Sequence, residues 1–135
     1  MRTRLIVMLT AAALLLAAAP VWAHHAFAAE FDQNKPLTLK GTVIRWEATN
    51  PHSWIHMNVK GDDGKPILWM IEGGSPNNLY RLGFTKESLP FGAEIVVEGY
   101  QARDRSNRAV GKNVTFADGK RLFLGLQEVD SAGKK

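Results

Sequence analysis

The sequence predicts an all-β domain with one short helix, and three observations lead to that fold class. Residues 37–48, LTLKGTVIRWEA, alternate apolar and polar side chains and are rich in β-branched residues, as long strands are. Gly41 interrupts this segment, and a glycine inside a strand marks a bulge or bend that lets one strand join two sheets. The elements follow the order of three strands, a helix and two strands. This order predicts a five-stranded OB-like barrel.

The first three strands are expected to form a meander. Asn50 and Pro51 end the first strand, because proline lacks the N–H that a sheet requires and restricts the residue before it. Residues 53–60 read as the second strand and residues 67–72 as the third. The glycine- and aspartate-rich segment 61–64 between them is typical of a hairpin loop.

A short helix and two further strands complete the predicted domain. In GGSPNNLYRLG, Ser75 suits the N-cap of a helix, Pro76 suits its first turn and Gly83 can end it. Residues 94–102 alternate again and predict a fourth strand. The last strand or hairpin is expected within residues 113–124, around Asp118 and Gly119.

The start of the chain has the pattern of a removable secretory signal. Arg2 and Arg4 precede an apolar run over residues 5–19, which is short for a membrane span and is followed by small residues. We expect a signal peptide over residues 1–23 and a periplasmic protein, although cleavage after Ala28 is an alternative. The remaining divisions are an N-terminal arm at 24–36, the OB-like domain at 37–127 and a disordered tail at 128–135.

Composition narrows the classes of function. The signal holds two of the 17 basic residues and none of the 13 acidic ones, so the mature chain is close to neutral. A nucleic-acid partner is therefore not expected, nor is stable insertion in a membrane after the signal is removed. The chain has no cysteine, which excludes disulfides, thiolate metal ligands and thiol nucleophiles.

The histidines suggest a metal site. In a strand, His52, Trp54 and His56 share one face, and steps of about 7 Å along that face allow imidazoles to lean toward one ion. Cleavage after Ala23 makes His24 the first residue, whose amine and imidazole can chelate a metal together. Such a nitrogen-rich set suits Cu(II) and resembles the histidine brace of copper-binding exported proteins. A local chelate of the amine with the amide and imidazole of His25 is the alternative.

Simpler interpretations stand beside the copper site. Exposed histidines on a strand are often merely solvated, and a histidine after Asn-Pro often fixes a turn through its ring nitrogen. A metal-free module is the rival function, with Trp54 as an apolar anchor for a protein, peptide or glycan. In it, a basic loop before the last strand would bind an anionic ligand, unless it is only a solvated loop; its cations are Arg103, Arg105, Arg108 and Lys112.

No enzyme is expected. The sequence contains no nucleophile elbow, paired carboxylates at readable spacing or zinc-enzyme helix motif. The segment EGGSPNN lacks the lysine and spacing of a phosphate-binding loop, so it reads as a turn and a helix cap.

Several segments together are similar to a family of small exported proteobacterial proteins of uncharacterised function. The similarity covers nearly all of the mature chain and lies in HHAFAAEFD, KGTVIRWEATNPHSWIHM, EGGSPNNLYRLGFTKESL, GYQARDRSNRAVGK and DGKRLFLG. Within these segments, His-His-Ala-Phe and Asn-Pro-His-Ser-Trp are the characteristic motifs. The resemblance implies a periplasmic location and no particular activity or cofactor.

Overall fold

The computed structural model describes residues 29–125 of the chain, which form six strands and one short helix. The elements are β1 (Phe31–Thr49), β2 (His52–Lys60), β3 (Pro66–Gly73), α2 (Pro76–Arg81), β4 (Glu94–Ala102), β5 (Arg108–Phe116) and β6 (Arg121–Phe123). No helix within these residues has the length and apolar character needed to cross a bilayer.

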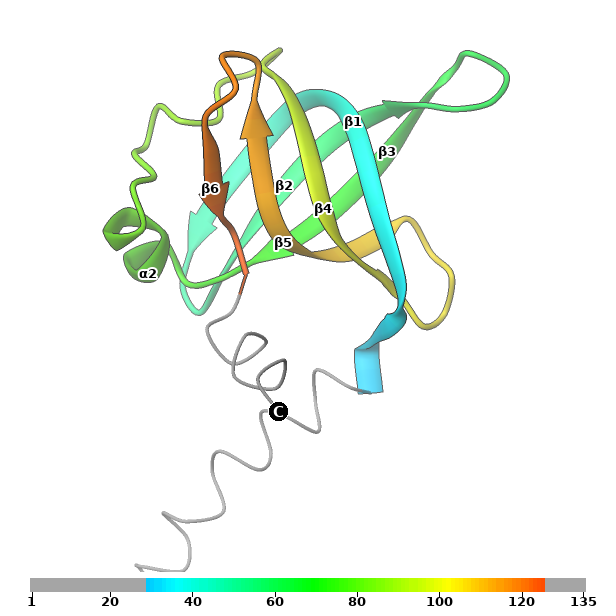
Figure 1. Cartoon of the computed structure of the whole chain (residues 1–135), viewed down its shortest axis with the longest axis horizontal. Coiled ribbons are helices and arrows are strands. Elements are labelled where there is room, and N and C mark those ends of the chain that lie inside the picture. Colours follow the sequence, from blue (N-terminus) through cyan, green and yellow to red (C-terminus); the bar gives the residue numbers. More distant parts are fainter. Residues whose placement is uncertain (1–28, 126–135) are drawn as a thin grey trace, which may run out of the picture.

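Five of the strands form a ring. Its order is β1, β2, β3, β5 and β4, and it closes because β4 pairs with β1 again (Figure 1). Every neighbouring pair is antiparallel except β3 and β5, which run parallel over three paired residues. The short strand β6 adds to the edge of β5. The all-β class, the single short helix and the OB-like order of the five strands are thereby confirmed.

Strand β1 takes part in both halves of the ring, and it changes partner at Gly41. This residue lies opposite Val59 of β2 and also opposite Ile95 of β4. A Cβ atom at Gly41 would stand 2.1 Å from the backbone oxygen of Asn58, which no side chain tolerates. The bend that the glycine predicts is present, and its cause is this close approach of two backbones.

The interior of the ring holds an apolar core. On β2, Ser53, Ile55 and Met57 have no exposed surface, whereas the alternate residues are partly exposed. The face of β2 predicted to point inward is therefore the buried one. The other fully buried apolar side chains of this core are Val43, Ile71, Leu79, Val97, Ala109, Val114 and Leu124.

Helix α2 and the chain after β6 pack on the core from outside the ring of strands. The Ser75 hydroxyl caps the helix by accepting a hydrogen bond of 3.3 Å from the Asn78 N–H, and Gly83 follows with a positive φ of 105°. The helix thereby buries Leu79 completely. Leu124 is also fully buried, and its backbone bonds to Lys112 and Gly74 hold it there.

Two strands extend beyond their expected bounds. Strand β1 begins at Phe31 rather than at residue 37, so it includes residues assigned above to the N-terminal arm. Residues 32–36 are polar or proline, so they show no alternation of apolar and polar residues that would predict a strand. Phe31 at the start of the extension is nevertheless buried, with 2% of its surface exposed. Strand β5 begins at Arg108 rather than at residue 113, which places Arg108 and Lys112 on a strand and corrects their assignment to a loop. The predicted signal peptide at 1–23 and the predicted tail at 128–135 lie outside the described residues.

Replacing Gly41 with alanine should destabilise the fold by at least about 2 kcal/mol, because the new methyl group meets backbone rather than a movable side chain. Urea unfolding monitored by tryptophan fluorescence measures the loss. Gly61→Ala is the matched control, since its Cβ would stand 2.8 Å from the end of the Ile67 side chain, which can rotate away. Equal losses in the two variants would contradict the account of the bend.

Candidate functional site

The outer face of β2 begins at His52, which contacts a buried carboxylate on the neighbouring strand. The Nδ1 atom of His52 pairs with Oε1 of Glu72, whose side chain is only 8% exposed. The imidazole itself is 41% exposed. Bonding through Nδ1 fixes the ring and leaves Nε2 as its remaining ligand atom. Metal-binding imidazoles are usually held in this way, by a carboxylate that bonds the ring nitrogen that does not bind the metal.

Charged side chains of β2, of β5 and of the residue that precedes β1 act on Glu72. Burial raises the pKa of the Glu72 carboxyl above its ordinary value of 4.5, and the nearby Glu30 carboxylate acts in the same direction. His52 and Arg108 lower this pKa, but burial is the largest effect. Glu30 also pairs with Arg108, which lies opposite Met70 on β3, so residue 30 lies near the strand that carries Glu72.

His56 has a different environment from His52. Its side chain is 12% exposed, and its Nε2 atom lies 3.3 Å from Oε1 of Glu47 on β1. This nitrogen is buried and the contact lacks hydrogen-bond geometry. His52 and His56 are four residues apart, about 13 Å along an extended strand. Each imidazole faces its own glutamate, so the described structure does not bring the two histidines together.

Two of the four candidate ligands, His24 and His25, lie outside the described residues. Among residues 29–125, no three histidine, aspartate or glutamate side chains are grouped closely enough to hold a metal ion. Trp54, the predicted apolar anchor, is half-buried on the outer face between the two histidines. Its neighbours in register are Glu47 on β1 and Glu72 on β3.

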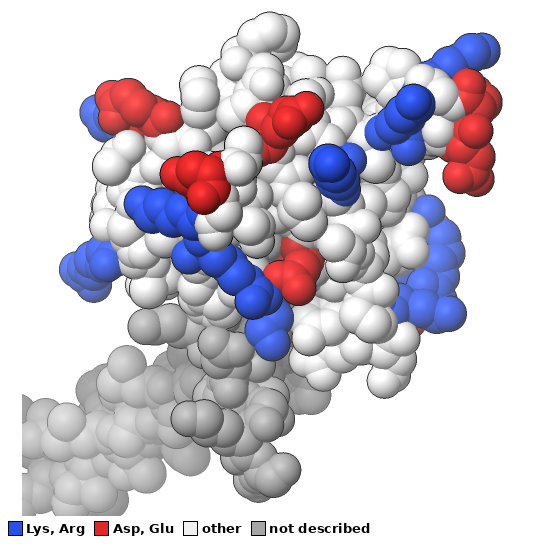
Figure 2. All heavy atoms as spheres, turned by 45° about the horizontal axis from the view of Figure 1, so that its top comes forward, with Lys and Arg blue, Asp and Glu red and all other residues white. Residues whose placement is uncertain are grey.

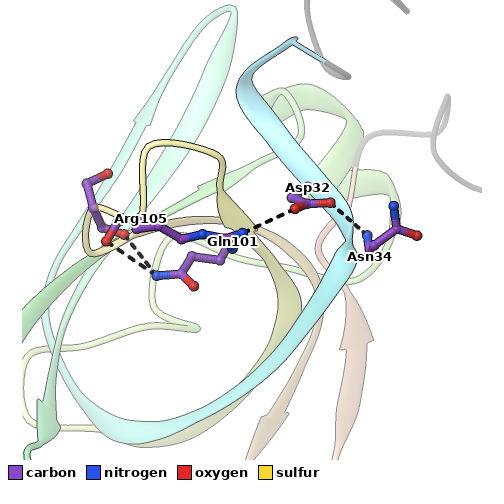
Figure 3. A network of polar contacts seen from close by, with 5 residues as sticks. Asp32, Asn34, Gln101 and Arg105 are labelled. Carbon is purple, nitrogen blue, oxygen red and sulfur yellow. Dashed lines mark hydrogen bonds and ion pairs between the residues drawn. The ribbon is translucent and has the colours of Figure 1, made fainter.

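The loop between β4 and β5 is held in one conformation by its own polar groups. The Gln101 side chain donates hydrogen bonds to the carbonyl oxygens of Arg105 and Ser106, at 3.5 and 3.4 Å (Figure 3). Asp104 accepts from the N–H and the hydroxyl of Ser106, which lowers the pKa of Asp104. Arg105 adopts a positive φ of 62°, an uncommon conformation for a residue with a side chain.

Two of the four cations that the sequence assigned to the basic loop, Arg105 and Arg108, pair with acidic side chains of the chain. Nη2 of Arg105 lies 3.6 Å from Oδ2 of Asp32, and Nη2 of Arg108 lies 3.0 Å from Oε1 of Glu30. The backbone N–H of Arg103 donates to the Glu30 carbonyl. On the face shown in Figure 2, basic and acidic side chains are interspersed. The two paired arginines are thus less available to an anionic ligand than their spacing in the sequence suggests.

A groove of about 710 Å³ lies at the other end of the outer face of β2. It is lined mainly by side chains of β1 and β2, among them Lys40, Thr42, Asn58 and Lys60. Neither His52 nor the residues around it line this groove. The His52–Glu72 pair is therefore a separate feature of the surface.

The acidic residues beside the two histidines, Glu72 and Glu47, were not predicted from the sequence. Glu72 lies near the end of an otherwise apolar strand. If the residues of the two strands are paired outward from the hairpin loop, Glu72 lies opposite Trp54 and diagonally across from His52. An ionisable residue within such a strand is a signal that could have found it. Glu30 gives no comparable signal, because its partner Arg108 is far along the chain.

Glu72→Gln should make the metal-free protein more stable at pH 8. Because the folded-state pKa of Glu72 is raised, its ionisation costs stability as pH rises through that pKa, and the amide cannot ionise. The advantage should disappear below pH 4.5, where the carboxyl is protonated in both states. Urea unfolding across this range measures it. Glu47→Gln is the control, since that carboxylate is 40% exposed; a less stable Glu72→Gln protein at pH 8 would contradict the dominance of burial.

Comparison with known proteins places the chain in a family. Residues 12–112 match the model described as "Family of unknown function (DUF6152)". No match was found among curated proteins, and none among solved structures. Because the family model covers most of the sequence, the chain belongs to this family of unknown function, DUF6152.

Proposed function

We propose that this protein is a non-enzymatic, periplasmic binding protein that holds one Cu(II) ion through His24 and His52. The observation that carries the proposal is the His52–Glu72 pair, in which a largely buried carboxylate supports a partly exposed imidazole. When bound, Cu(II) would take imidazole and amine nitrogens in a planar arrangement, which are the ligands and the geometry that it prefers.

His24 would supply the amine and a second imidazole. It precedes Glu30 by six residues, so an extended chain reaches about 20 Å from Glu30. Glu30 pairs with Arg108, and Arg108 lies opposite Met70, which is two residues before Glu72 on β3. A mature chain beginning at His24 is therefore long enough to bring its first residue to His52. His25 offers the local alternative, a chelate of the amine with its own amide and imidazole nitrogens.

His56 is the weaker of the two strand ligands. Its Nε2 is buried and faces Glu47, whereas the His52 ring is 41% exposed. Recruiting His56 would require its imidazole to leave the packed face. His52 is therefore the third nitrogen donor of the proposed site, and His56 holds no metal.

Single substitutions should separate the histidines. Glu72→Gln removes the carboxylate that holds His52 and should weaken Cu(II) binding about ten- to hundredfold. His52→Ala removes the ligand itself and should weaken binding by more than that. His56→Ala is the matched control on the same face and should leave the affinity unchanged. Competition titration against a chelator of known affinity measures all three variants. Equal losses for His52→Ala and His56→Ala would contradict the assignment.

The mature N-terminus decides whether the site can exist. Native mass spectrometry of protein purified from the periplasm, with and without one equivalent of Cu(II), should show a chain that begins at His24 and holds one ion. The His24→Ala protein should lose that ion and keep its fold. A chain that begins at Ala29, or a His24 chain that ignores copper, would overturn the proposal.

A metal-free binding module is the second candidate, and the apolar outer face of β2 and β3 favours it. Leu68 is 51% exposed, and the half-buried Trp54 and Met70 lie on the same face according to the strand register. This is the face on which OB folds bind their ligands. Under this alternative, Trp54 would contact a protein, peptide or glycan, whereas the paired Arg105 and Arg108 would contribute less.

Trp54 fluorescence distinguishes the two candidates. In the first, Cu(II) quenches Trp54 in the metal-free protein, and the difference between wild type and Trp54→Phe isolates this signal from Trp46 and Trp69. In the second, only an organic partner changes the signal. A response to Cu(II) that persists in Trp54→Phe would place the ion away from this face.

A further inference from the structure

The first half of β3 is an open edge of the sheet. Strand β3 pairs with β2 from Pro66 to Gly73, but with β5 only from Met70 to Glu72. Among residues 29–125, no strand lies beside β3 before Met70 on the side away from β2. Figure 1 shows the hairpin of β2 and β3 reaching beyond the rest of the ring at this end. Residues 66–69 therefore form a free sheet edge, which we call the β3 edge.

The hydrogen bond between β3 and the residue before β5 shows which backbone groups of the β3 edge point outward. The Met70 N–H points away from β2 and donates to the Asn107 carbonyl at 3.0 Å. In an antiparallel pair, the N–H and carbonyl of one residue point to the same side, and this side alternates along the strand. Leu68 and Pro66 lie two and four residues before Met70, so their backbone groups also point away from β2.

The presence of a proline at position 66 agrees with this orientation. The Lys65 carbonyl accepts a hydrogen bond of 2.8 Å from the Gly61 N–H, so Lys65 bonds across the hairpin and Pro66 faces the other way. Proline lacks an N–H and occurs in sheets where that group would face away from a neighbouring strand. The β3 edge thus offers a partner the Pro66 carbonyl and both backbone groups of Leu68. Within the described residues, no backbone group bonds to them on that side.

Apolar side chains flank these backbone groups on both faces of the sheet. Leu68 is 51% exposed on the outer face, with the partly buried Met70 next to it. Ile67 is 38% exposed on the opposite face, next to the partly buried Trp69. Residues 66–69 include no charged side chain, although charges, lysine above all, commonly keep other strands from a sheet edge. An added strand with apolar side chains would therefore find apolar neighbours on both of its faces.

The β3 edge suits a short segment better than a second copy of the chain. A stable dimer uses about 20 to 30 residues on each side, far more than this edge holds. Two-fold pairing about Leu68 would bring Pro66 of one copy opposite Met70 of the other, where Arg108 already lies. Two-fold pairing about Ile67 would leave the Leu68 carbonyl facing a proline nitrogen, which cannot donate.

The direction of the added segment follows from the same geometry. An antiparallel segment bonds all three outward groups through its two residues opposite Leu68 and Pro66. A parallel segment would need a residue opposite Trp69 to reach the Leu68 carbonyl. Asn107 lies there, because the next residue, Arg108, is opposite Met70.

We propose that the β3 edge binds a short, extended segment of another polypeptide, which adds to the sheet as a strand antiparallel to β3. The segment carries apolar, β-branched side chains, which suit strands and the apolar neighbours on both faces. Copper has no part in this binding. Leu68 lies four residues before Glu72, about 13 Å along the strand, so the β3 edge is also distinct from the His52–Glu72 pair.

Amide hydrogen exchange, measured by nuclear magnetic resonance with a chelator present, tests the edge itself. In the free protein, the Leu68 amide should exchange at least about tenfold faster than the amides of Ile67 and Trp69, which face β2. Slow exchange of Leu68 at every protein concentration would mean that the chain itself covers the edge, and the proposal would fail. Slowing that appears only at high concentration would assign the edge to a second copy and overturn the proposal as well.

A displayed library of random octapeptides, selected against the full mature chain with a chelator present, tests the occupant. Enriched peptides should be apolar and β-branched, and their synthetic forms should slow exchange of the Leu68 amide. Leu68→Pro removes the outward N–H and keeps the bonds to β2, so it should weaken peptide binding at least about tenfold. Leu68→Val is the matched control, because it keeps the N–H and an apolar side chain, and it should bind as wild type does.

Two further variants separate the β3 edge from the rest of the surface. Phe91→Ala removes an aromatic side chain that is 80% exposed, and Trp54→Ala removes the anchor of the metal-free candidate function. Neither should change the affinity for the peptides. Peptides that bind Leu68→Pro and wild type equally, or no enriched peptide at all, would overturn the proposal. Should Leu68→Pro not fold, Leu68→Lys takes its place, and unchanged affinity in that variant would be equally decisive against the β3 edge.

Discussion

The close approach of β1 to β2 at Gly41 is the constraint on which the ring depends. A single strand serves as the neighbour of both β2 and β4, and it changes partner where a Cβ would collide with the backbone oxygen of Asn58. Without that approach, the two halves of the sheet would not share a core. Strand β1 places two features of the site. Its second half pairs with β2, which carries His52, and its first half pairs with β4 and holds Phe31 on the sheet.

The parts of the fold that can be predicted from the sequence are those whose structure is determined by neighbouring residues. The alternation in β2 exposes His52 and buries Ile55, and the cap at Ser75 starts a helix, because both follow from neighbouring residues alone. The first residues of β1 and of β5 were not predicted to belong to strands. Phe31 is buried in a cluster with Ala102 and Val110, which are 71 and 79 residues away in the chain, so no nearby sequence pattern predicts its burial.

The same distinction applies to the candidate site. The histidines were identifiable by residue type, but their placement beside two different glutamates depends on cross-strand neighbours. His52 rests on Glu72 from β3, whereas His56 faces Glu47 from β1. The cations of the basic loop were read as open to a partner, yet Arg105 and Arg108 meet acidic residues from the start of β1. The number of charged residues can be read from the sequence, but which of them form ion pairs can be known only from the arrangement of the strands.

The pairing of β1 with β4 has a consequence for the time at which the domain forms. The first half of β1 finds its partner only after β4 has been synthesised, and the core is completed by Leu124 near the end of the chain. Contacts between such distant segments make folding slow compared with helical proteins. A nascent chain therefore stays unfolded until nearly all of it is available.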